Sequence, residues 1–447
     1  MKKFFTTLSN IWKIDDLRVR ITNTLLFLLI YRVGSFVTLP GINHATLEGQ
    51  KTKEGLVGLL NMFAGGSFSR ASIFALGVMP YISASIVMQL LGIAVPYFAK
   101  MQKEGESGRN KINQWTRYLT IAITAPQAFF YVHSQIASDA ILMPIAMFTI
   151  LNVFVLTAGT LFVMWLGEKI TDKGIGNGIS LIIMVGIIAQ LPQAFITEFA
   201  NRTTGTGGLI IFIVELVALI GVVMFTILIV QGTRKVAVQY AKRIVGNKQY
   251  GGVRQYIPLK VTAAGVMPII FAQALMFIPA TLASFFPTAA SNGILISLSN
   301  YNSWLHNVIF AILIIVFTFF YTAITINPNQ MADDMKKNGG FIPGVKPGQA
   351  TAGYLDDIIS KITLPGSICL AIVAVIPAIV TLAGVSSLFS RFFGGTSLII
   401  LVGVVLDTLQ QIESHLLMRH YDGLMKTGRI TGRTSIPTNS GASSPVI

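Results

Sequence analysis

The sequence predicts an all-α membrane protein that crosses the bilayer many times, and three observations lead to this fold class. Of its 447 residues, 53% are hydrophobic and only 11% are charged, whereas about 25% are charged in a typical soluble chain. Apolar runs that approach the roughly 20 residues of a membrane-spanning helix recur along the chain. The alternating segments of a β-barrel are absent from the sequence. These observations exclude a soluble multidomain enzyme, a disordered protein and a fibrous repeat.

Ten apolar segments are expected to form the membrane-spanning helices. The chain begins with a mixed amphipathic stretch, residues 1–20, and no small-residue cleavage site follows the first apolar run. We therefore predict that this run is a spanning helix and not a removed signal. The ten predicted spans are 21–37, 71–95, 118–132, 143–166, 179–196, 209–230, 264–286, 307–326, 362–384 and 394–412.

The distribution of basic residues predicts the orientation of these spans. An even number of spans puts both termini on the same side of the membrane. Of the 33 Lys and Arg residues, 27 lie on that side and 4 lie in the connections of the opposite side. Because basic connections stay in the cytoplasm, both termini are predicted to be cytoplasmic. The last fourteen residues, rich in Ser, Thr, Gly and Pro, are predicted to be disordered.

Two cytoplasmic connections stand out by their composition. The connection 231–263 contains three tyrosines, no Asp or Glu, and the basic residues Arg234, Lys235, Lys242, Arg243, Lys248, Arg254 and Lys260. Two interpretations remain open from these residues: side chains that enforce topology and touch lipid headgroups, or a docking surface for RNA or an acidic protein. In the connection 327–361, the glycine-rich core 339–344 predicts an ordered turn.

Few residues of the chain are of the types that form catalytic, metal or cofactor sites. Inside the spans only Arg32, Glu215 and Asp407 are charged, and we interpret them as snorkelling residues or interhelical pairs near a membrane face. The five histidines lack metal-ligand spacing, the single cysteine Cys369 excludes an intrachain disulfide, and no phosphate-loop lysine follows the glycines of 174–178. We predict no metal, no cofactor and no covalent chemistry, so the chain is expected to be a conduit or a scaffold.

A short apolar segment precedes the second span. The Gly-rich stretch 55–69 is too short to cross a bilayer, and residues 56–63 are expected to form two helical turns that end at Gly65 and Gly66. Such a half-helix either is buried in protein or in the mouth of a cavity, or lies on the membrane surface. The residues alone favour neither placement.

Pairs of aliphatic residues four positions apart occur in two predicted spans. Val78 and Ile82 form one pair, and Ile179 and Ile183 form the other. This spacing puts both branched side chains on one face of a helix. Such pairs are routine in lipid-facing helices, so the residues alone indicate lipid or packing contacts.

These segments also carry a close resemblance to a known family. The matching stretches are 61–66, 69–86, 103–109, 174–180, 258–261, 341–344 and 394–398. They occur in family order between about residue 20 and residue 412, and they resemble the bacterial SecY family, the channel-forming subunits of the Sec protein translocase. Several unrelated stretches of this length make coincidence negligible.

The resemblance implies a channel built from two inverted halves of five helices, 21–196 and 197–412, with a cytoplasmic segment 1–20 before them and a cytoplasmic tail 413–447 after them. The plug that closes the outer funnel would contain Leu56, Leu59, Leu60, Met62, Phe63, Gly65 and Gly66. The pore ring would consist of Val78, Ile82, Ile179, Ile183, Ile270 and Ile400. A lateral gate between the second and seventh helices would include Ser83 and Ile278.

The resemblance also implies partners. The two loops 231–263 and 327–361 would dock the SecA motor ATPase and the ribosome, and SecE and SecG subunits are expected. The channel would handle unfolded secretory precursors, signal peptides and membrane lipid. One departure from the family is Lys346, which stands where Arg is usual. Because Lys lacks the planar fork of Arg, a partner contact there is expected to be single-point or shifted.

The leading hypothesis is a non-enzymatic, pore-forming subunit of the bacterial inner membrane that passes unfolded secretory proteins and releases transmembrane segments sideways. The alternatives are a secondary transporter and a non-conducting scaffold. A transporter would need polar or charged residues at a midplane site, where this chain has apolar ones. Loss of solute uptake with export intact, after replacement of Glu215 and Asp407, would favour the transporter. Electrical silence after deletion of 56–66 would favour the scaffold.

Overall fold

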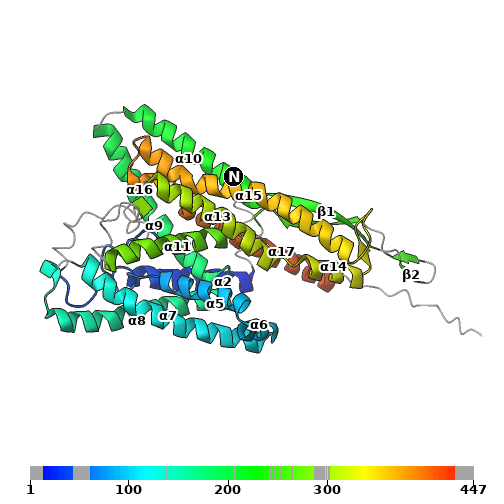
Figure 1. Ribbon diagram of the computed structural model, residues 1–447, viewed down its shortest axis with the longest axis horizontal. Coiled ribbons are helices and arrows are strands. Elements are labelled where there is room, and N and C mark those ends of the chain that lie inside the picture. Colours follow the sequence, from blue (N-terminus) through cyan, green and yellow to red (C-terminus); the bar gives the residue numbers. More distant parts are fainter. Residues whose placement is uncertain are drawn as a thin grey trace, which may run out of the picture.

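The computed structural model is a long helical body with a small β-sheet at one end (Figure 1). It describes residues 14–43, 61–136, 138–204, 208–240, 243–245, 248–250, 254–262, 265–285, 297–298, 300 and 303–427. The predicted disordered end of the chain and the first plug residues, Leu56, Leu59 and Leu60, lie outside these ranges.

Each of the ten predicted spans overlaps one long helix of the described chain. The first half contains α2 (Asp15–Gly34), α5 (Met79–Ala94), α7 (Glu106–Gln135), α8 (Ile145–Lys173) and α9 (Gly178–Thr204). The second half contains α10 (Gly208–Gln231), α11 (Met267–Phe285), α13 (Trp304–Thr325), α15 (Gln349–Leu382) and α17 (Gly395–Thr427). The short helices are α6 (Pro96–Lys103), the 3₁₀ turn η1 (Ser138–Ala140), α14 (Pro328–Lys337) and α16 (Ser387–Ser390).

Six helical stretches of the described chain are long and apolar enough to cross a membrane: α8, α9, α10, α15, α17 and Trp304–Lys337, which contains α13 and α14. The helices α5 and α6 would together make a seventh span, although they are bent by 102° where Pro96 begins α6. Proline has no N–H to continue the preceding helix, which accounts for the break.

The start of α2 is acidic, at Asp15 and Asp16, so its apolar part is shorter than the helix. In α11 the stretch Met267–Met276 is apolar but shorter than a membrane span.

The second predicted span begins too early. The helix α5 starts at Met79, and residues 64–78 form turns. Within them Gly65 and Ala71 have φ of 64° and 47°, left-handed conformations that a right-handed helix does not contain. Pro80 occupies the first turn of α5, where proline is favoured because that N–H has no helical partner.

The basic connection after α10 forms a β-hairpin. Strand β1 (Thr233–Tyr240) pairs antiparallel with β4 (Arg254–Lys260), and β5 (Gly340–Phe341) pairs with the other edge of β1. At the tip, β2 (Arg243–Val245) pairs with β3 (Lys248–Tyr250). The ordered turn predicted between α14 and α15 is therefore confirmed as part of a sheet. The helical fold class is also confirmed, but the sequence analysis did not predict this sheet.

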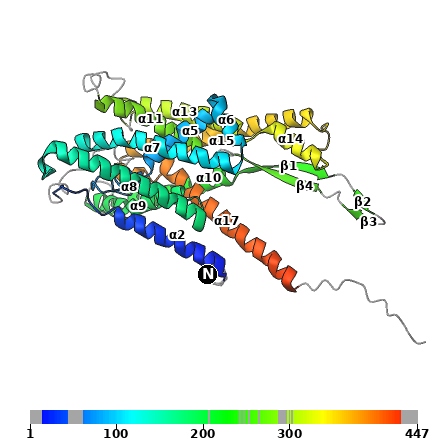
Figure 2. The same cartoon turned by 90° about the horizontal axis from the view of Figure 1, so that it is seen from below.

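One face of the sheet is buried against helices. Val236 and Val238 of β1 are 5% and 0% exposed, and they share an apolar cluster with Met335 of α14 and Leu355 of α15. Figure 2 shows the hairpin extending beside α14, beyond the end of the main helical body. Lys235 lies on the face of β1 opposite to Val236 and Val238, and Arg234 lies at the exposed end of the face that these two valines share.

The largest apolar cluster joins the two halves of the molecule. It contains residues of α2, α5, α8 and α9 together with residues of α16 and α17. A second cluster holds the turns of 64–78 against α7 and α8, and a third joins α11, α13 and α15. The cluster between the halves is where the predicted site residues lie.

Candidate pore constriction and plug

The six residues of the predicted ring lie in this one apolar cluster. Val78, Ile183 and Ile400 are at most 5% exposed. Ile82, Ile179 and Ile270 are partly buried and pack against the same cluster. Val78 is the N-cap of α5, and the other five residues belong to α5, α9, α11 and α17, so both halves contribute. Both i, i+4 pairs therefore face the protein interior, so of the two interpretations from the residues alone, lipid or packing contacts, packing is the correct one.

The end of the predicted plug reaches the same cluster. Met62 and Phe63 are 0% and 7% exposed and belong to it. After Phe63 the helical turn ends as predicted, with φ of 64° at Gly65 and 85° at Gly66. Gly66 N–H donates to the Asn61 carbonyl at 2.8 Å, and Gly65 N–H donates to the Met62 carbonyl at 3.1 Å. This pair of bonds is the Schellman motif, which requires a left-handed residue after the helix.

The plug end lies directly against α9. A Cβ on Gly186 of α9 would lie 2.5 Å from the Phe63 carbonyl oxygen, so only glycine permits this approach. The buried Gln190 of α9 donates its Nε2 to the Asn61 carbonyl at 2.8 Å. The sequence analysis missed both residues, because a glycine and a glutamine in an apolar helix have no distinctive spacing.

Two arginines also hold the plug end. Arg32 of α2 and Arg70 each donate to the Gly65 carbonyl at 3.0 Å. Their guanidinium carbons lie 4.7 and 4.4 Å from the centroid of the Phe36 ring, a cation–π arrangement. Burial and the adjacent charge of Arg32 lower the pKa of the Arg70 guanidinium. Arg32 thus binds the backbone of the plug end, a contact that the interpretation as a snorkelling residue or interhelical pair did not include.

The predicted gate residues lie on α5 and α11. Ser83 is half-buried, and its hydroxyl donates to the Met79 carbonyl of its own helix at 3.2 Å. Ile278 lies in α11, at a position whose side chain is outside the description. On α11 the structure describes the side chains of residues 267–276, and among these no hydrogen bond or ion pair joins α11 to an α5 side chain. On α11, the Nε2 of Gln273 is buried and has no hydrogen-bond partner among the described residues.

The predicted docking residues gather on the sheet. Arg234 and Lys235 are exposed on β1, and Arg254 and Lys260 are exposed on β4. The side chains of Arg243 and Lys248 are not described, and Lys242 lies outside the described residues. Because β5 pairs with β1, the turn that leads to the exposed Lys346 joins the same surface. The two predicted docking loops are thus one structural unit.

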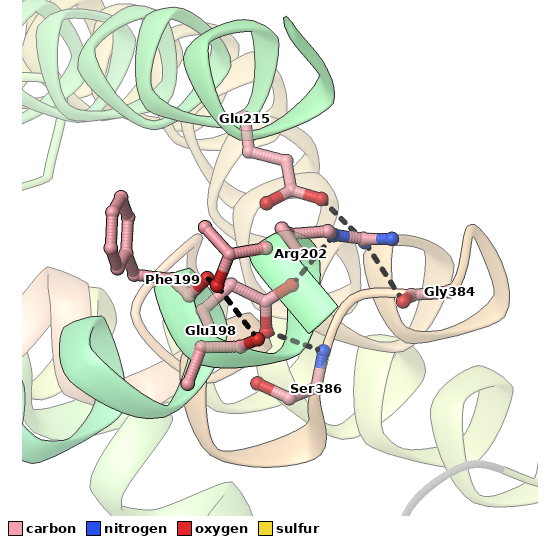
Figure 3. Close-up of polar contacts among 8 residues, drawn as sticks. Glu198, Phe199, Arg202, Glu215, Gly384 and Ser386 are labelled. Carbon is pink, nitrogen blue, oxygen red and sulfur yellow. Dashed lines mark hydrogen bonds and ion pairs between the residues drawn. The ribbon is translucent and has the colours of Figure 1, made fainter. Parts of the chain in front are cut away.

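The remaining charged residues of the spans differ in their surroundings. Asp407 is exposed on α17. Glu215 of α10 is 7% exposed and accepts a hydrogen bond from Arg202 of α9 at 2.6 Å (Figure 3). The interhelical pair predicted for Glu215 is confirmed. Its partner was missed because Arg202 was assigned to a connection, whereas α9 extends through Thr204. Among the described residues, no group of three or more His, Cys, Asp or Glu could hold a metal ion.

Comparisons with known proteins identify the family of the chain and show solved structures with a similar fold. The SecY family model matches residues 72–409. The protein translocase subunit SecY of Halalkalibacterium halodurans is 42% identical over 435 residues, which cover 94% of this chain and 100% of the relative. A solved protein-conducting channel has a TM-score of 0.65 at 18% identity, over 92% of this chain and 95% of the other. Sec61 in a canine ribosome–channel complex from the endoplasmic reticulum has a TM-score of 0.58 at 18% identity, over the same shares.

Proposed function

The chain belongs to the SecY family, and we propose that it is the pore-forming subunit of a bacterial protein translocase. It is a multi-pass membrane protein, and in this proposal it lies in the inner membrane with both termini in the cytoplasm. Unfolded secretory chains pass between its two halves, 21–196 and 197–412. Transmembrane segments leave sideways into lipid.

One observation supports the proposal above all others. Branched side chains from both halves meet in a single apolar cluster, and the plug residues Met62 and Phe63 belong to the same cluster. A constriction lined by aliphatic side chains excludes ions by dewetting. It also binds no particular side chain of a passing polypeptide, so it accepts chains of any sequence. In this proposal the ring seals around the moving chain.

Opening the pore requires the plug end to leave. The bonds that it must give up are those of Gly65 with Arg32 and Arg70, and that of Asn61 with Gln190. A net hydrogen bond between neutral groups is worth about 0.5–1.5 kcal/mol, and one that involves a charged group such as these guanidinium groups is worth about 1.5–3 kcal/mol. A few such bonds keep the plug in place without making its release prohibitive.

Lateral release would occur between α5 and α11, where Ser83 and Ile278 lie. Ile82 of α5 and Ile270 of α11 pack against the same apolar cluster, and apolar contacts of this kind exchange readily with lipid or with an apolar signal peptide. No step of this cycle needs covalent chemistry by the chain, and we propose that it is not an enzyme.

The basic sheet is proposed as the docking surface for the ribosome and for the SecA motor. Its exposed residues Arg234, Lys235, Arg254 and Lys260 carry no neighbouring carboxylate in the hairpin sequence. Phosphates of ribosomal RNA favour such a surface. The similar canine Sec61 belongs to a ribosome–channel complex. SecE and SecG are proposed as further subunits, and Lys346 as a single-point contact.

Crosslinking of a translocation intermediate tests the pore. A photo-reactive residue replaces Ile270, and a secretory precursor is arrested part-way across the membrane. The control replaces Ile312 of α13, which is 55% exposed on the outside of the bundle. Crosslinks at position 270 and none at 312 are expected. Absence of crosslinks at 270, with the precursor demonstrably engaged, would overturn the pore assignment.

A further inference from the structure

The last turn of α9 carries an arginine that binds three other parts of the chain (Figure 3). Arg202 Nε lies 3.0 Å from Glu198 Oε1, and its Nη2 lies 2.6 Å from Glu215 Oε1. The same Nη2 donates to the Gly384 carbonyl at 2.9 Å. The second oxygen of Glu198 accepts from the Ser386 backbone N–H at 3.0 Å. We call Glu198, Arg202 and Glu215 the triad.

The three side chains of the triad are almost completely buried. The side chains of Glu198, Glu215 and Arg202 are 1%, 8% and 12% exposed. Two carboxylates share one guanidinium, so removal of that guanidinium would leave two buried, uncompensated carboxylates. Breaking a buried pair in this way costs far more than the intact pair contributes. The fork of Arg supplies donors in fixed directions, which a Lys ammonium does not.

Aromatic rings also join α9 to the second half. The ring of Phe212 in α10 lies 5.1 Å from Phe195 and 5.6 Å from Phe199, both on α9. Phe389 of α16 lies 6.5 Å from Phe212. Aromatic packing therefore joins α9, α10 and α16 in addition to the polar contacts of the triad.

The triad lies where the two halves join. It starts on α9, the last helix of the first half, and all its contacts beyond α9 belong to the second half: α10 and the turn between α15 and α16. Only residues 205–207 separate α9 from α10 along the chain. The other end of α9 meets the second half through a bond from Gly176 N–H to Gln411 Oε1 of α17, at 2.8 Å.

We propose that Arg202 is a positioning residue that sets the angle between the two halves and thereby keeps the constriction closed. The inference rests on the proposed function, since it requires the halves to form a pore. Between Gly178 and Arg202, α9 spans about 36 Å at 1.5 Å per residue. A rotation of about 5° at the triad would move the far end of α9 by about 3 Å. Ile179 and Ile183 lie at that end, so a small loosening of the triad opens the ring.

The test compares two Arg→Lys substitutions in the complete complex, reconstituted in lipid vesicles. Arg202→Lys keeps the positive charge and removes the planar guanidinium group with its fixed donor directions. Arg117→Lys is the control, because Arg117 pairs with Glu168 at 2.6 Å within the first half, between α7 and α8. We expect at least a fivefold increase in halide leak for Arg202→Lys, and less than a twofold change for Arg117→Lys.

A distance measurement separates positioning from general instability. Spin labels replace Asp172 and Leu409, which are exposed on α8 and α17, in a background with Cys369→Ala. Arg202→Lys is expected to shift or broaden the distance between the labels by at least 2 Å, while the control leaves it unchanged. If the Arg202→Lys complex fails to assemble, the same measurements are made on Glu215→Gln, because this substitution keeps the side-chain volume and removes one charge.

The outcomes distinguish this inference from the proposed function. Wild-type vesicles that do not translocate a precursor overturn the proposed function, whatever the variants do. Wild-type vesicles that translocate, with leak and label distance unchanged in the assembled Arg202→Lys or Glu215→Gln variant, overturn the positioning role alone. Equal changes in the Arg117→Lys control would overturn it as well.

Discussion

The helices α5 and α9 contribute the same sequence feature to the constriction, yet the structure holds them in different ways. Each supplies an aliphatic i, i+4 pair to the central cluster. At its C-terminal end α9 is fixed by the triad, just before its N-terminal end by Gln411, and between them by the plug. In the described chain, no α5 side chain makes a hydrogen bond or ion pair with another helix; Ser83 binds its own helix.

This difference indicates which wall of the pore moves. Polar bonds are directional and fix a helix in one position, whereas apolar packing tolerates exchange of one neighbour for another. We infer that α9 is the fixed wall, and we propose that α5, which lies beside the proposed gate, is the mobile wall. The comparison predicts that substitutions on α9 are more damaging than substitutions on α5, in an order given by the contacts that each removes.

The largest effect is expected for Arg202→Ala. This change leaves Glu198 and Glu215 buried without a cation, and such losses cost about 3–5 kcal/mol. Thermal unfolding of the purified complex, or its yield where it no longer assembles, measures the effect. Arg117→Ala is the control, since its pair with Glu168 is 47% and 25% exposed and is worth at most about 1 kcal/mol. Equal losses in the two variants would contradict the view of α9 as the anchored wall.

The next effect is expected for Gly186→Ala on the plug-facing side of α9. The new Cβ would lie 2.5 Å from the Phe63 carbonyl, so the plug end must shift, at a cost of about 1–3 kcal/mol. Halide leak through vesicles containing the closed channel should rise severalfold. Gly221→Ala in α10 is the matched control, because a Cβ there meets nothing within 4 Å. A closed, non-leaking Gly186→Ala channel would show that the plug does not depend on this contact.

A smaller effect is expected for Gln190→Met, which keeps the length of the side chain and removes its donor. The Asn61 carbonyl retains its bond from Gly66, so the loss should be about 0.5–1.5 kcal/mol. The leak should rise less than for Gly186→Ala while translocation continues. A leak as large as that of Gly186→Ala would mean that Gln190, and not the close backbone approach, holds the plug.

The helices and turns compared above could be predicted from the sequence, but the bonds that hold α9 in place could not. All ten spans correspond to helices, and the glycines that end the plug turn adopt the expected left-handed conformations. The period-two pattern of Val236 and Val238 in β1 is a strand signal, but it is short and stands in a segment whose most evident feature is its basic charge.

The anchors of α9 could not be predicted from local pattern. Arg202 contacts Gly384, 182 positions away, and Gly176 contacts Gln411, 235 positions away. Spacing within one helix carries no information about such partners. The grouping of the ring residues also came from family resemblance, since an i, i+4 aliphatic pair has the same appearance in a lipid-facing helix.

The smallest effect is expected on α5, for Ser83→Ala. The Ser83 hydroxyl binds only the Met79 carbonyl, which already accepts a helical backbone bond, so its removal should change the free energy of unfolding by less than about 0.5 kcal/mol. Closed-channel leak should stay within twofold of wild type. Thr171→Ala on α8 is the contrasting variant, because the Thr171 hydroxyl also accepts from the Gly178 N–H at the start of α9, at 2.9 Å. Loss of that bond should cost about 1 kcal/mol. A Ser83→Ala channel that is less stable than Thr171→Ala would mean that α5, and not α9, is the anchored wall.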